Sequence, residues 1–300
     1  MEWIAWSPLY CHVLEKGHKF PMEKYELIPQ QLLYEGSIEQ NEIFEPGMLE
    51  KDVALLTHDT QYWDRFINLQ LNEIEKRRIG FPLSRLLVNR ELNIMQGTVE
   101  CSLKALKTGL ACNIAGGTHH AFTNRGEGFC LLNDIAIAAT YLLHLGNVQR
   151  IFICDLDVHQ GNGTAQIFSN NKSVFTFSMH GRDNYPLRKE GSDLDIELPT
   201  GTLDEEYLIQ LENVFQQVVP KFAPDFVFYN SGVDVLATDR FGKLALSIEG
   251  CRSRDEMVFN YCYKNNIPVV AAMGGGYSKE LNLITEAHCN TFRIAKKIFF

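Results

Sequence analysis

The sequence predicts an α/β fold, with a parallel sheet covered by helices on both faces, in one domain over residues 1–300. Several short runs are apolar throughout, without the alternation of a half-exposed strand, which is typical of strands buried on both faces. Segments with apolar residues every three or four positions lie between or beside these runs and predict helices. Strands and helices that alternate in this way favour a parallel sheet.

The predicted elements follow one another without an internal repeat or a linker-like change in composition. Pro224 and Pro268 stand at the starts of two predicted strands, where a missing N–H costs little. Asp204, followed by two glutamates, is expected to cap the start of a helix. The predicted strands span residues 111–115, 151–155, 173–178, 225–230 and 268–273, and the predicted helices span residues 131–145, 204–219 and 248–264.

The composition excludes several classes of protein. The 28 lysines and arginines stand against 37 aspartates and glutamates, a net charge of −9. We therefore expect no direct nucleic-acid partner, whereas a cationic peptide would not be repelled. The eight cysteines are scattered without metal-binding spacing, so neither a thiolate zinc site nor a disulfide scaffold is expected. Without an apolar run near ~18 residues or a secretory signal, we expect no membrane span and an intracellular protein, cytoplasmic by default or nuclear.

Polar clusters follow all five predicted strands. Ligands of open α/β sheets bind beyond the carboxyl ends of the strands. Five clusters at one edge of the sheet therefore predict a shared site. The clusters are GGTHH (116–120), DLDVH (155–159), SMHG (178–181), NSGVD (230–234) and GGGY (274–277).

Asp157, His159 and Asp234 are the candidate metal ligands. Asp157 and His159 are two positions apart, so on an extended segment they point to the same side. With Asp234 from another strand end they form a three-ligand set with an open fourth position, the plan of a catalytic zinc site. The alternative is that Asp157 and His159 only bond to backbone at the strand end.

His119 and His120 are candidates for proton transfer. Each imidazole needs a partner on its other nitrogen to fix the tautomer and the basicity, and Asp155 and Asn162 are the candidate partners. The alternative is two loop histidines that face solvent. Tyr277, after three glycines, is a candidate donor of a hydrogen bond to a developing oxyanion.

Aromatic residues near the predicted site suggest a narrow channel. Phe129, in GEGFCLLND (126–134), and Tyr185 are candidate walls that suit an alkyl chain. Core packing is the alternative for both. Gly128 and Gly275 are assigned to the same channel.

The chain contains five motifs in the order GGxHH, GFCxxND, DLDxHQGNG, NxGxD and GGGY. In this combination and order, they resemble the motifs of the zinc-dependent histone deacetylases. The likeness extends from SPLY (7–10) and HKFPMEKY (18–25) to GGGY (274–277). DLDVHQGNG (155–163) and DRFG (239–242) are most similar to class IV histone deacetylases and related bacterial proteins.

The resemblance implies an arginase/deacetylase fold with a mostly parallel sheet of about eight strands. It implies that Asp157, His159 and Asp234 bind Zn²⁺. His120 falls on the position of the general base and acid, and His119 on that of its electrostatic partner.

Further positions follow from the same resemblance. Asp155 matches the carboxylate behind His119, and Tyr277 matches the phenol that polarises the carbonyl. Phe129 and Tyr185 match the walls of the aromatic tunnel.

Two monovalent-cation sites, which hold K⁺ in relatives, are also implied. Asp155 and Ser178 match the site near the zinc. Phe168, Asn171 and Val174 match the second site.

Two positions depart from the pattern. Many members have an aspartate where Asn162 stands, and an amide carries no charge to favour the imidazolium form of His120. Several relatives also place an aspartate that binds the substrate backbone in the rim loop, but residues 77–82 contain no acidic residue.

The predicted reaction is hydrolysis of the amide of acyl-lysine in a protein or peptide, with histones among the candidates and long fatty-acyl chains beside acetyl. One rival is a binuclear manganese ureohydrolase of the same fold, which would need a second metal-binding carboxylate run near Asp234. A second rival is a deacetylase of acetylpolyamines or other small amides. A third rival is a non-catalytic module that binds acyl-lysine.

Overall fold

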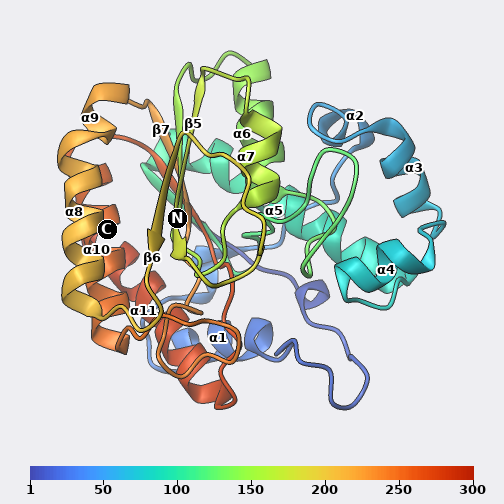
Figure 1. Ribbon diagram of the computed structural model, residues 1–300, viewed down its shortest axis with the longest axis horizontal. Coiled ribbons are helices and arrows are strands. Elements are labelled where there is room, and N and C mark those ends of the chain that lie inside the picture. Colours follow the sequence, from blue (N-terminus) through green and yellow to red (C-terminus); the bar gives the residue numbers. More distant parts are fainter.

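Eight strands form one sheet in which every neighbouring pair is parallel, in the order β2-β1-β3-β8-β7-β4-β5-β6. The computed structural model describes residues 1–300, and Figure 1 shows the sheet between two layers of helices. The predicted α/β class and the parallel sheet of about eight strands are confirmed. The strands are β1 (Ile4–Ala5), β2 (Ile43–Phe44), β3 (Leu110–Asn113), β4 (Ile151–Asp155), β5 (Val174–Gly181), β6 (Leu194–Leu198), β7 (Phe226–Asn230) and β8 (Val269–Ala272).

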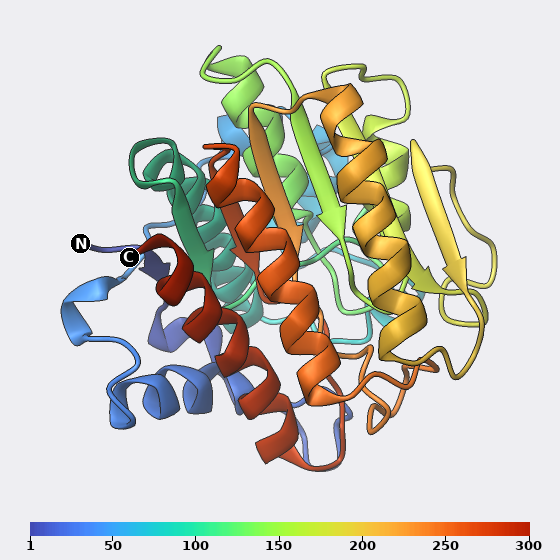
Figure 2. The ribbon, with the colours of Figure 1, turned by 90° about the vertical axis from the view of Figure 1, so that its left-hand side faces the viewer.

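Helices cover both faces of the sheet, as the burial of the central strands requires. In Figure 2, α8, α10 and α11 lie side by side over the nearer face, while α5 and α6 lie behind the sheet. The two termini meet, with the rings of Trp3 and Phe300 5.5 Å apart. The helices are α1 (Lys24–Tyr34), α2 (Lys51–Ala54), α3 (Thr60–Ile67), α4 (Glu73–Ile79), α5 (Arg85–Thr108), α6 (Asp134–His144), α7 (Asn162–Phe168), α8 (Asp204–Gln217), α9 (Val219–Phe222), α10 (Ile248–Lys264) and α11 (Leu281–Phe299), with short 3-10 helices at Pro8–Tyr10 and Gln40–Glu42.

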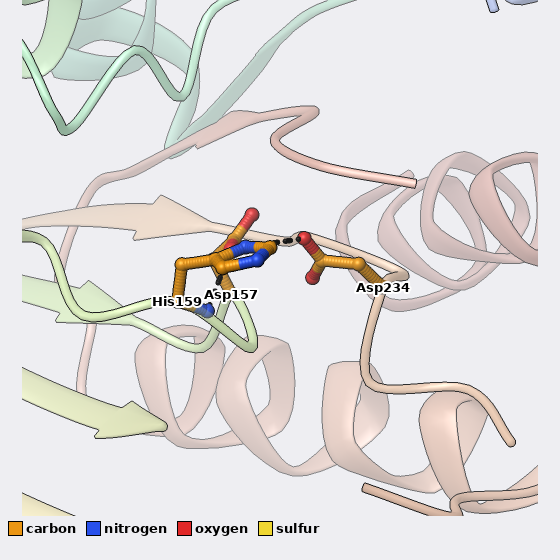
Figure 3. Close-up of side chains that lie close together, drawn as sticks. All are labelled: Asp157, His159 and Asp234. Carbon is orange, nitrogen blue, oxygen red and sulfur yellow. Dashed lines mark hydrogen bonds and ion pairs between the residues drawn. The ribbon is translucent and has the colours of Figure 1, made fainter. Parts of the chain in front are cut away.

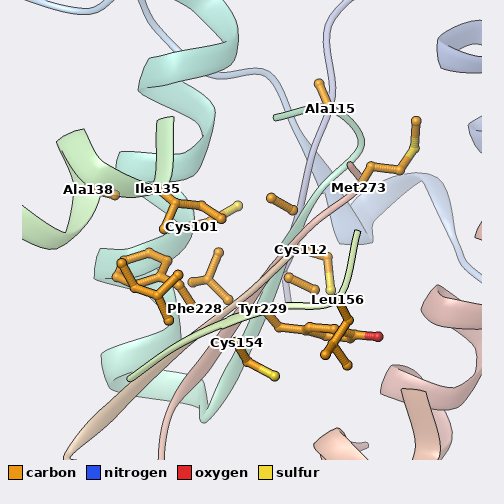
Figure 4. Close-up of a cluster of buried hydrophobic side chains, with 14 of the residues drawn as sticks. Cys101, Cys112, Ala115, Ile135, Ala138, Cys154, Leu156, Phe228, Tyr229 and Met273 are labelled. Carbon is orange, nitrogen blue, oxygen red and sulfur yellow. The ribbon is translucent and has the colours of Figure 1, made fainter. Parts of the chain in front are cut away.

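The core lies along the middle strands, between the sheet and its helices. Every residue of β3, β4, β7 and β8 is buried. Cys112, Cys154 and Phe228 pack there among aliphatic side chains (Figure 4). Each large apolar side chain buried in this way contributes roughly 1.5–3 kcal/mol of transfer free energy. All eight cysteines are free thiols, so packing and not crosslinks holds the sheet together.

The strand register aligns the carboxyl ends of the central strands. Asp155, the last residue of β4, pairs with Ser178 of β5 on one side and with Asn230 of β7 on the other. Ala272 of β8 pairs with Asn230 and with Asn113. The loops after β3, β4, β7 and β8 therefore leave the sheet at the same edge.

Two predicted boundaries and one predicted helix cap are corrected by the structure. Residues 178–181 belong to β5, because the pairing with β6 continues to Gly181. The helix expected from residue 131 begins at Asp134, where the Asn133 side chain caps it by accepting from Ala136 N (3.0 Å). Asp204 does not cap its own helix; its carboxylate accepts from the backbone N–H (2.8 Å) and hydroxyl (2.6 Å) of Ser247, the N-cap of α10.

None of the helices combines the length and the apolar character needed to cross a membrane.

Candidate active site

Asp157, His159 and Asp234, here called the ligand group, come together at the carboxyl edge of the sheet. Asp157 and His159 follow β4, and Asp234 follows β7, the neighbour of β4. One ligand atom from each residue lies within 4.8 Å of the others (Figure 3). Nδ1 of His159 lies 3.0 Å from Asp157 Oδ1 and 3.1 Å from Asp234 Oδ2. The predicted ligands therefore converge on one point.

The charges of the ligand group fit a bound cation. Burial disfavours the charged form of Asp157, yet the neighbouring imidazoles of His119 and His159 hold the pKa of that carboxyl well below its usual value. Burial and the charge of Asp157 raise the pKa of Asp234 to about 7. Burial alone would lower the pKa of His159, but the two carboxylates raise it to about 10. Without a metal ion, Nδ1 of His159 therefore carries a proton between the two buried carboxylates. A metal ion fits in the position of that proton.

At Gly275 the backbone lies so close to the ligand group that there is no room for a side chain. The N–H of Gly275 donates to Asp157 Oδ2 (2.8 Å). A Cβ at Gly275 would lie 2.6 Å from that oxygen and would clash with Asp234 Oδ2 as well. Gly275, predicted to lie along the channel, therefore lies at its floor, where it lets the backbone approach both carboxylates.

His119 and His120, here called the imidazole pair, each bond to the predicted partner. His119 Nδ1 lies 2.7 Å from Asp155 Oδ2, and His120 Nδ1 lies 2.6 Å from Asn162 Oδ1. Both histidines are buried, so the interpretation as loop residues facing solvent is wrong. The two rings are 4.1 Å apart.

The two imidazoles differ in basicity because their partners differ in charge. Burial would lower the pKa of His119, but the carboxylates of Asp155 and Asp157 raise it to about 9. Burial and the positive charges of His119 and His159 lower the pKa of His120 well below its usual value, and the hydrogen bond to the neutral Asn162 does not offset them. His120 is thus the neutral imidazole, which suits a proton acceptor.

Tyr277 lies beside the ligand group on the loop after β8. Its ring centroid is 6.5 Å from that of His159, and burial and the nearby Asp157 and Asp234 raise the pKa of its phenol well above 10. Tyr277 is therefore a neutral hydrogen-bond donor. Its backbone N–H donates to Asp239 Oδ2 (2.6 Å), and Asp239 Oδ1 accepts from Phe241 N (2.8 Å). Both carboxylate oxygens of Asp239 therefore hold the backbone of these loops.

Aromatic side chains wall a cavity of about 410 Å³ that leads to the site. Phe129 and Tyr185 both line it, as predicted, together with Phe241, which the sequence analysis did not select. The Tyr185 ring stands at 90° to that of His120, with centroids 4.9 Å apart, and its hydroxyl donates to Glu127 Oε2 (2.6 Å).

Gly128 is needed where this channel passes His120. Its φ is +51°, and a Cβ there would lie 2.8 Å from His120 Cδ2. Only glycine meets both conditions without strain. The next residue, Phe129, also has a positive φ of 66°. Hydrogen bonds from Gly128 N to Arg78 O (3.0 Å) and from Phe129 N to Ile79 O (2.7 Å) fasten this wall to the C-terminal end of α4, so residues 77–79 of the predicted rim loop are helical.

The residues predicted to bind monovalent cations lie at two places. Asp155 and Ser178 are partners across β4 and β5, close to the ligand group, although the Ser178 hydroxyl also lies 3.0 Å from His180 Nδ1. Phe168, Asn171 and Val174 surround the turn between α7 and β5, at the opposite end of β5. Both K⁺ sites stay predictions.

Arg254 is a buried residue that the sequence analysis missed. Its guanidinium donates to the carbonyl oxygens of Gly232 (2.6 Å) and Leu156 (3.3 Å), which lie in the loops that carry the ligand group. A guanidinium can hold several carbonyls at once because its five N–H groups form a planar fork. Arg254 therefore ties both ligand-bearing loops to α10.

Asp255 neutralises Arg254 within the core. Their side chains form an ion pair of 2.8 Å, and Asp255 also accepts from Thr291 Oγ1 (2.6 Å) and from the Tyr229 hydroxyl. The pair could have been noticed in the sequence as two charges three and four positions after Cys251, on the buried face of a predicted helix.

The buried Asp-His-Asp group at the carboxyl edge of the parallel α/β sheet is a candidate metal site. The family model of the histone deacetylase domain matches residues 18–292. The chain therefore belongs to the histone deacetylase family. Its membership of class IV stays a prediction.

Individual relatives agree with this assignment. A Picosynechococcus protein without a functional name is 40% identical over 296 residues, covering 99% of each chain. Histone deacetylase 2 of Arabidopsis thaliana is 31% identical over 277 residues, covering 89% of this chain and 71% of its own. The crystal structure of a histone deacetylase homologue from Aquifex aeolicus has the same fold, with a TM-score of 0.82, 23% identity, and coverage of 98% of this chain and 84% of that one.

Proposed function

We propose that this protein is a zinc-dependent hydrolase of acyl-lysine amides in proteins or peptides. One observation carries the proposal. The ligand group lies beside the imidazole pair and Tyr277 at the inner end of an aromatic-walled cavity. A metal ion, a proton acceptor and an oxyanion donor around one point are the parts that amide hydrolysis requires.

Asp157, His159 and Asp234 would hold the zinc ion. Two carboxylates and one imidazole are ligands of the type that catalytic zinc takes, and they leave a position open for water or substrate. When bound, zinc would acidify the attacking water and polarise the acyl carbonyl. Hydrogen bonds from Gly275 N and Val158 N to Asp157 and Asp234 (2.8 and 2.9 Å) fix the carboxylates before the ion arrives.

His120 would move the proton. Its neutral imidazole accepts a proton from the attacking water and then delivers one to the departing lysine amine. Asn162 holds Nδ1 of the ring at 2.6 Å, which leaves Nε2 as the nitrogen for this transfer. His119, charged and paired with Asp155, keeps the pKa of its neighbour low, so that His120 is neutral at the start of the reaction.

Tyr277 would stabilise the oxyanion. Its neutral phenol donates a hydrogen bond to the carbonyl oxygen as negative charge develops there. Asp239 holds the Tyr277 backbone, and the Phe129 and Phe241 rings flank the side chain, with centroids 6.0 and 5.1 Å away. These contacts limit the positions that the hydroxyl can take.

A panel of acyl-lysine peptides, from acetyl to myristoyl, tests this function. We expect hydrolysis of at least one member, inhibition by a hydroxamate chelator, and about one zinc per chain. Substitution Tyr277→Phe is expected to lower kcat about 10²–10³-fold while zinc is retained. His144→Ala, at an exposed position on α6, is the control.

Other results would favour the rivals. Two manganese ions per chain would indicate a ureohydrolase, although the engaged Asp239 carboxylate argues against it. Activity on acetylpolyamines but not on peptides would indicate a small-amide deacetylase. Stoichiometric zinc without turnover of any acyl chain would indicate a binding module and would refute the proposed hydrolase.

A further inference from the structure

The cavity mouth differs in charge from the molecule as a whole. The chain carries a net charge of −9, yet the charged side chains that line the mouth are Lys19, Lys243 and one acid, Asp183. Lys19 forms no ion pair; its ammonium lies 5.9 Å from the Phe241 ring centroid. A substrate that inserts its acyl-lysine into the cavity must bring its neighbouring residues past these ammonium groups.

Backbone carbonyls of the loop after β5, and not carboxylates, hold two lysines near the mouth. Lys243 Nζ donates to Asp183 O (2.8 Å). Lys189 Nζ donates to Asn184 O (2.8 Å) and Pro186 O (2.6 Å). Carbonyl oxygens fix the position of an ammonium group without cancelling its charge, so both positive charges remain available to a ligand.

The acids close to the mouth, Asp183 and Glu127, are outnumbered by the cations Lys19, Lys243, Arg78 and Arg125. The Asp183 carboxylate accepts from Thr200 Oγ1 (2.7 Å). Glu127 accepts from Arg125 Nε (2.8 Å) and the Tyr185 hydroxyl (2.6 Å), with Arg78 Nε 4.0 Å away. Arg78, in the last turn of α4, is exposed and shares Glu127 with Arg125, so the two arginines together leave one positive charge on that side.

We propose that this mouth selects acyl-lysines that are flanked by acidic residues. Lys19, Lys243 and Arg78 form the cationic rim, and its occupant is a peptide segment with aspartate or glutamate next to the acyl-lysine. The inference rests on the proposed function for the acyl-lysine itself and adds the class of sequence around it. It runs against the expectation, from net charge alone, that the protein accepts a cationic peptide.

The size of the effect follows from exposed ion pairs. One such pair is worth about a 1.4- to 5-fold change in affinity. A peptide with two flanking acids meets two rim lysines, whereas a peptide with two flanking arginines is repelled. The affinities of the two peptides should therefore differ roughly tenfold or more. Because the pairs are exposed, the preference must weaken as the Debye length falls from ~10 Å at 0.1 M salt to ~3 Å at 1 M.

Three peptides test the rim, with acyl-lysine between pairs of glutamates, serines or arginines. Binding is measured by fluorescence anisotropy with fluorescein-labelled peptides, and hydrolysis is measured separately by mass spectrometry. We expect the glutamate peptide to bind roughly tenfold more tightly than the arginine peptide at 0.05 M salt, and the two to converge at 1 M. Equal binding, or preference for arginine, would overturn the inference while leaving the hydrolase intact. Acid-selective binding without hydrolysis would refute the hydrolase but not the rim.

Variants identify the charges responsible. The double substitution Lys19→Gln/Lys243→Gln is expected to reduce the ratio of the two affinities to below about threefold, and Lys19→Glu/Lys243→Glu to reverse it. Lys172→Gln/Lys221→Gln removes the same charge at exposed positions before β5 and on α9, away from the mouth, and should leave the ratio unchanged. An equal loss in this control would show that only net charge matters and would overturn the inference.

Discussion

The ligand group and the imidazole pair lie in the same pocket but differ in charge balance. In the ligand group, two buried carboxylates approach Nδ1 of a single histidine, at 3.0 and 3.1 Å. In the imidazole pair, each Nδ1 has an acceptor of its own, at 2.7 and 2.6 Å. In the first arrangement two carboxylates share one imidazole, which leaves negative charge for a bound cation to balance, whereas the second arrangement is complete without a cation. The comparison indicates that metal binding and proton transfer depend on separate residues.

The largest effect is expected from the ligand group. Asp234→Asn keeps the shape of the side chain but removes one of the two carboxylates. We expect the affinity for zinc to fall by more than the ~100-fold that a change outside the ligands costs, with turnover lost in parallel. Zinc per chain, measured by mass spectrometry of the metal, checks this, with Asp52→Asn on the exposed surface of α2 as the control. Full zinc content in Asp234→Asn would contradict the assignment.

His120→Ala should separate the two functions. Loss of the proton acceptor is expected to lower kcat by about 10²–10⁴-fold. Zinc content should not change, because His120 bonds to Asn162 and not to the ligand group. Parallel measurement of turnover and bound zinc checks this. If zinc is lost as well, the two sides of the pocket do not act separately.

The buried pair Arg254 and Asp255 is expected to affect zinc affinity through the backbone. The double variant Arg254→Met/Asp255→Asn removes the guanidinium that holds Leu156 and Gly232, without leaving an unpaired buried charge. We expect zinc affinity to fall about 10–100-fold, as for other groups that orient metal ligands. A competition titration with a zinc indicator measures it.

Arg90 and Glu91 on α5 provide a matched control for this pair. They form another buried ion pair of neighbouring residues, but Arg90 Nε donates to Tyr10 O (2.8 Å) and not to the ligand-bearing loops. Arg90→Met/Glu91→Gln should lower the thermal stability without changing zinc affinity. Equal losses of zinc affinity in the two double variants would show that the role of Arg254 is general stability.

The smallest effect is a shift in pH dependence. Asn162→Asp places a carboxylate on Nδ1 of His120, which favours the imidazolium form and raises the pKa of His120. Since the acceptor must be neutral, the acid limb of the pH–rate profile should move to higher pH. Asn162→Ala removes the acceptor without adding charge and should not move the limb in that direction. A profile of kcat/KM for the three proteins checks the sign.

The central strands of the fold could be predicted from sequence because they are apolar on both faces. β4, β7 and β8 fall within predicted runs, and β3 and β5 overlap theirs. β1 and β2 have two residues each, too few for a pattern. β6 is the strand at the sheet edge, where Asp195 and Glu197 interrupt the apolar residues. Short and half-exposed strands acquire their structure from pairing and not from local composition.

The site could be predicted where a motif directly follows a strand. The ligand group and the imidazole pair satisfy that condition, and the structure brings them together. Arg254, Asp239 and Phe241 do not, because their contacts are set by the packing of α10 and of the loop after β7. The cationic rim could not be predicted either, since it joins residues more than 200 positions apart, from Lys19 to Lys243.

The strand order also affects how the chain can be made. β8 lies between β3 and β7 and provides the pairing that connects β2, β1 and β3 to the other four strands. Its residues, 269–272, come last among the strands in chain order, so β8 leaves the ribosome after the other seven strands. His120 follows a strand on one side of β8, and Asp157 follows a strand on the other side. A chain cut before β8 would therefore lack the strand that joins the two parts of the sheet and brings these two residues together.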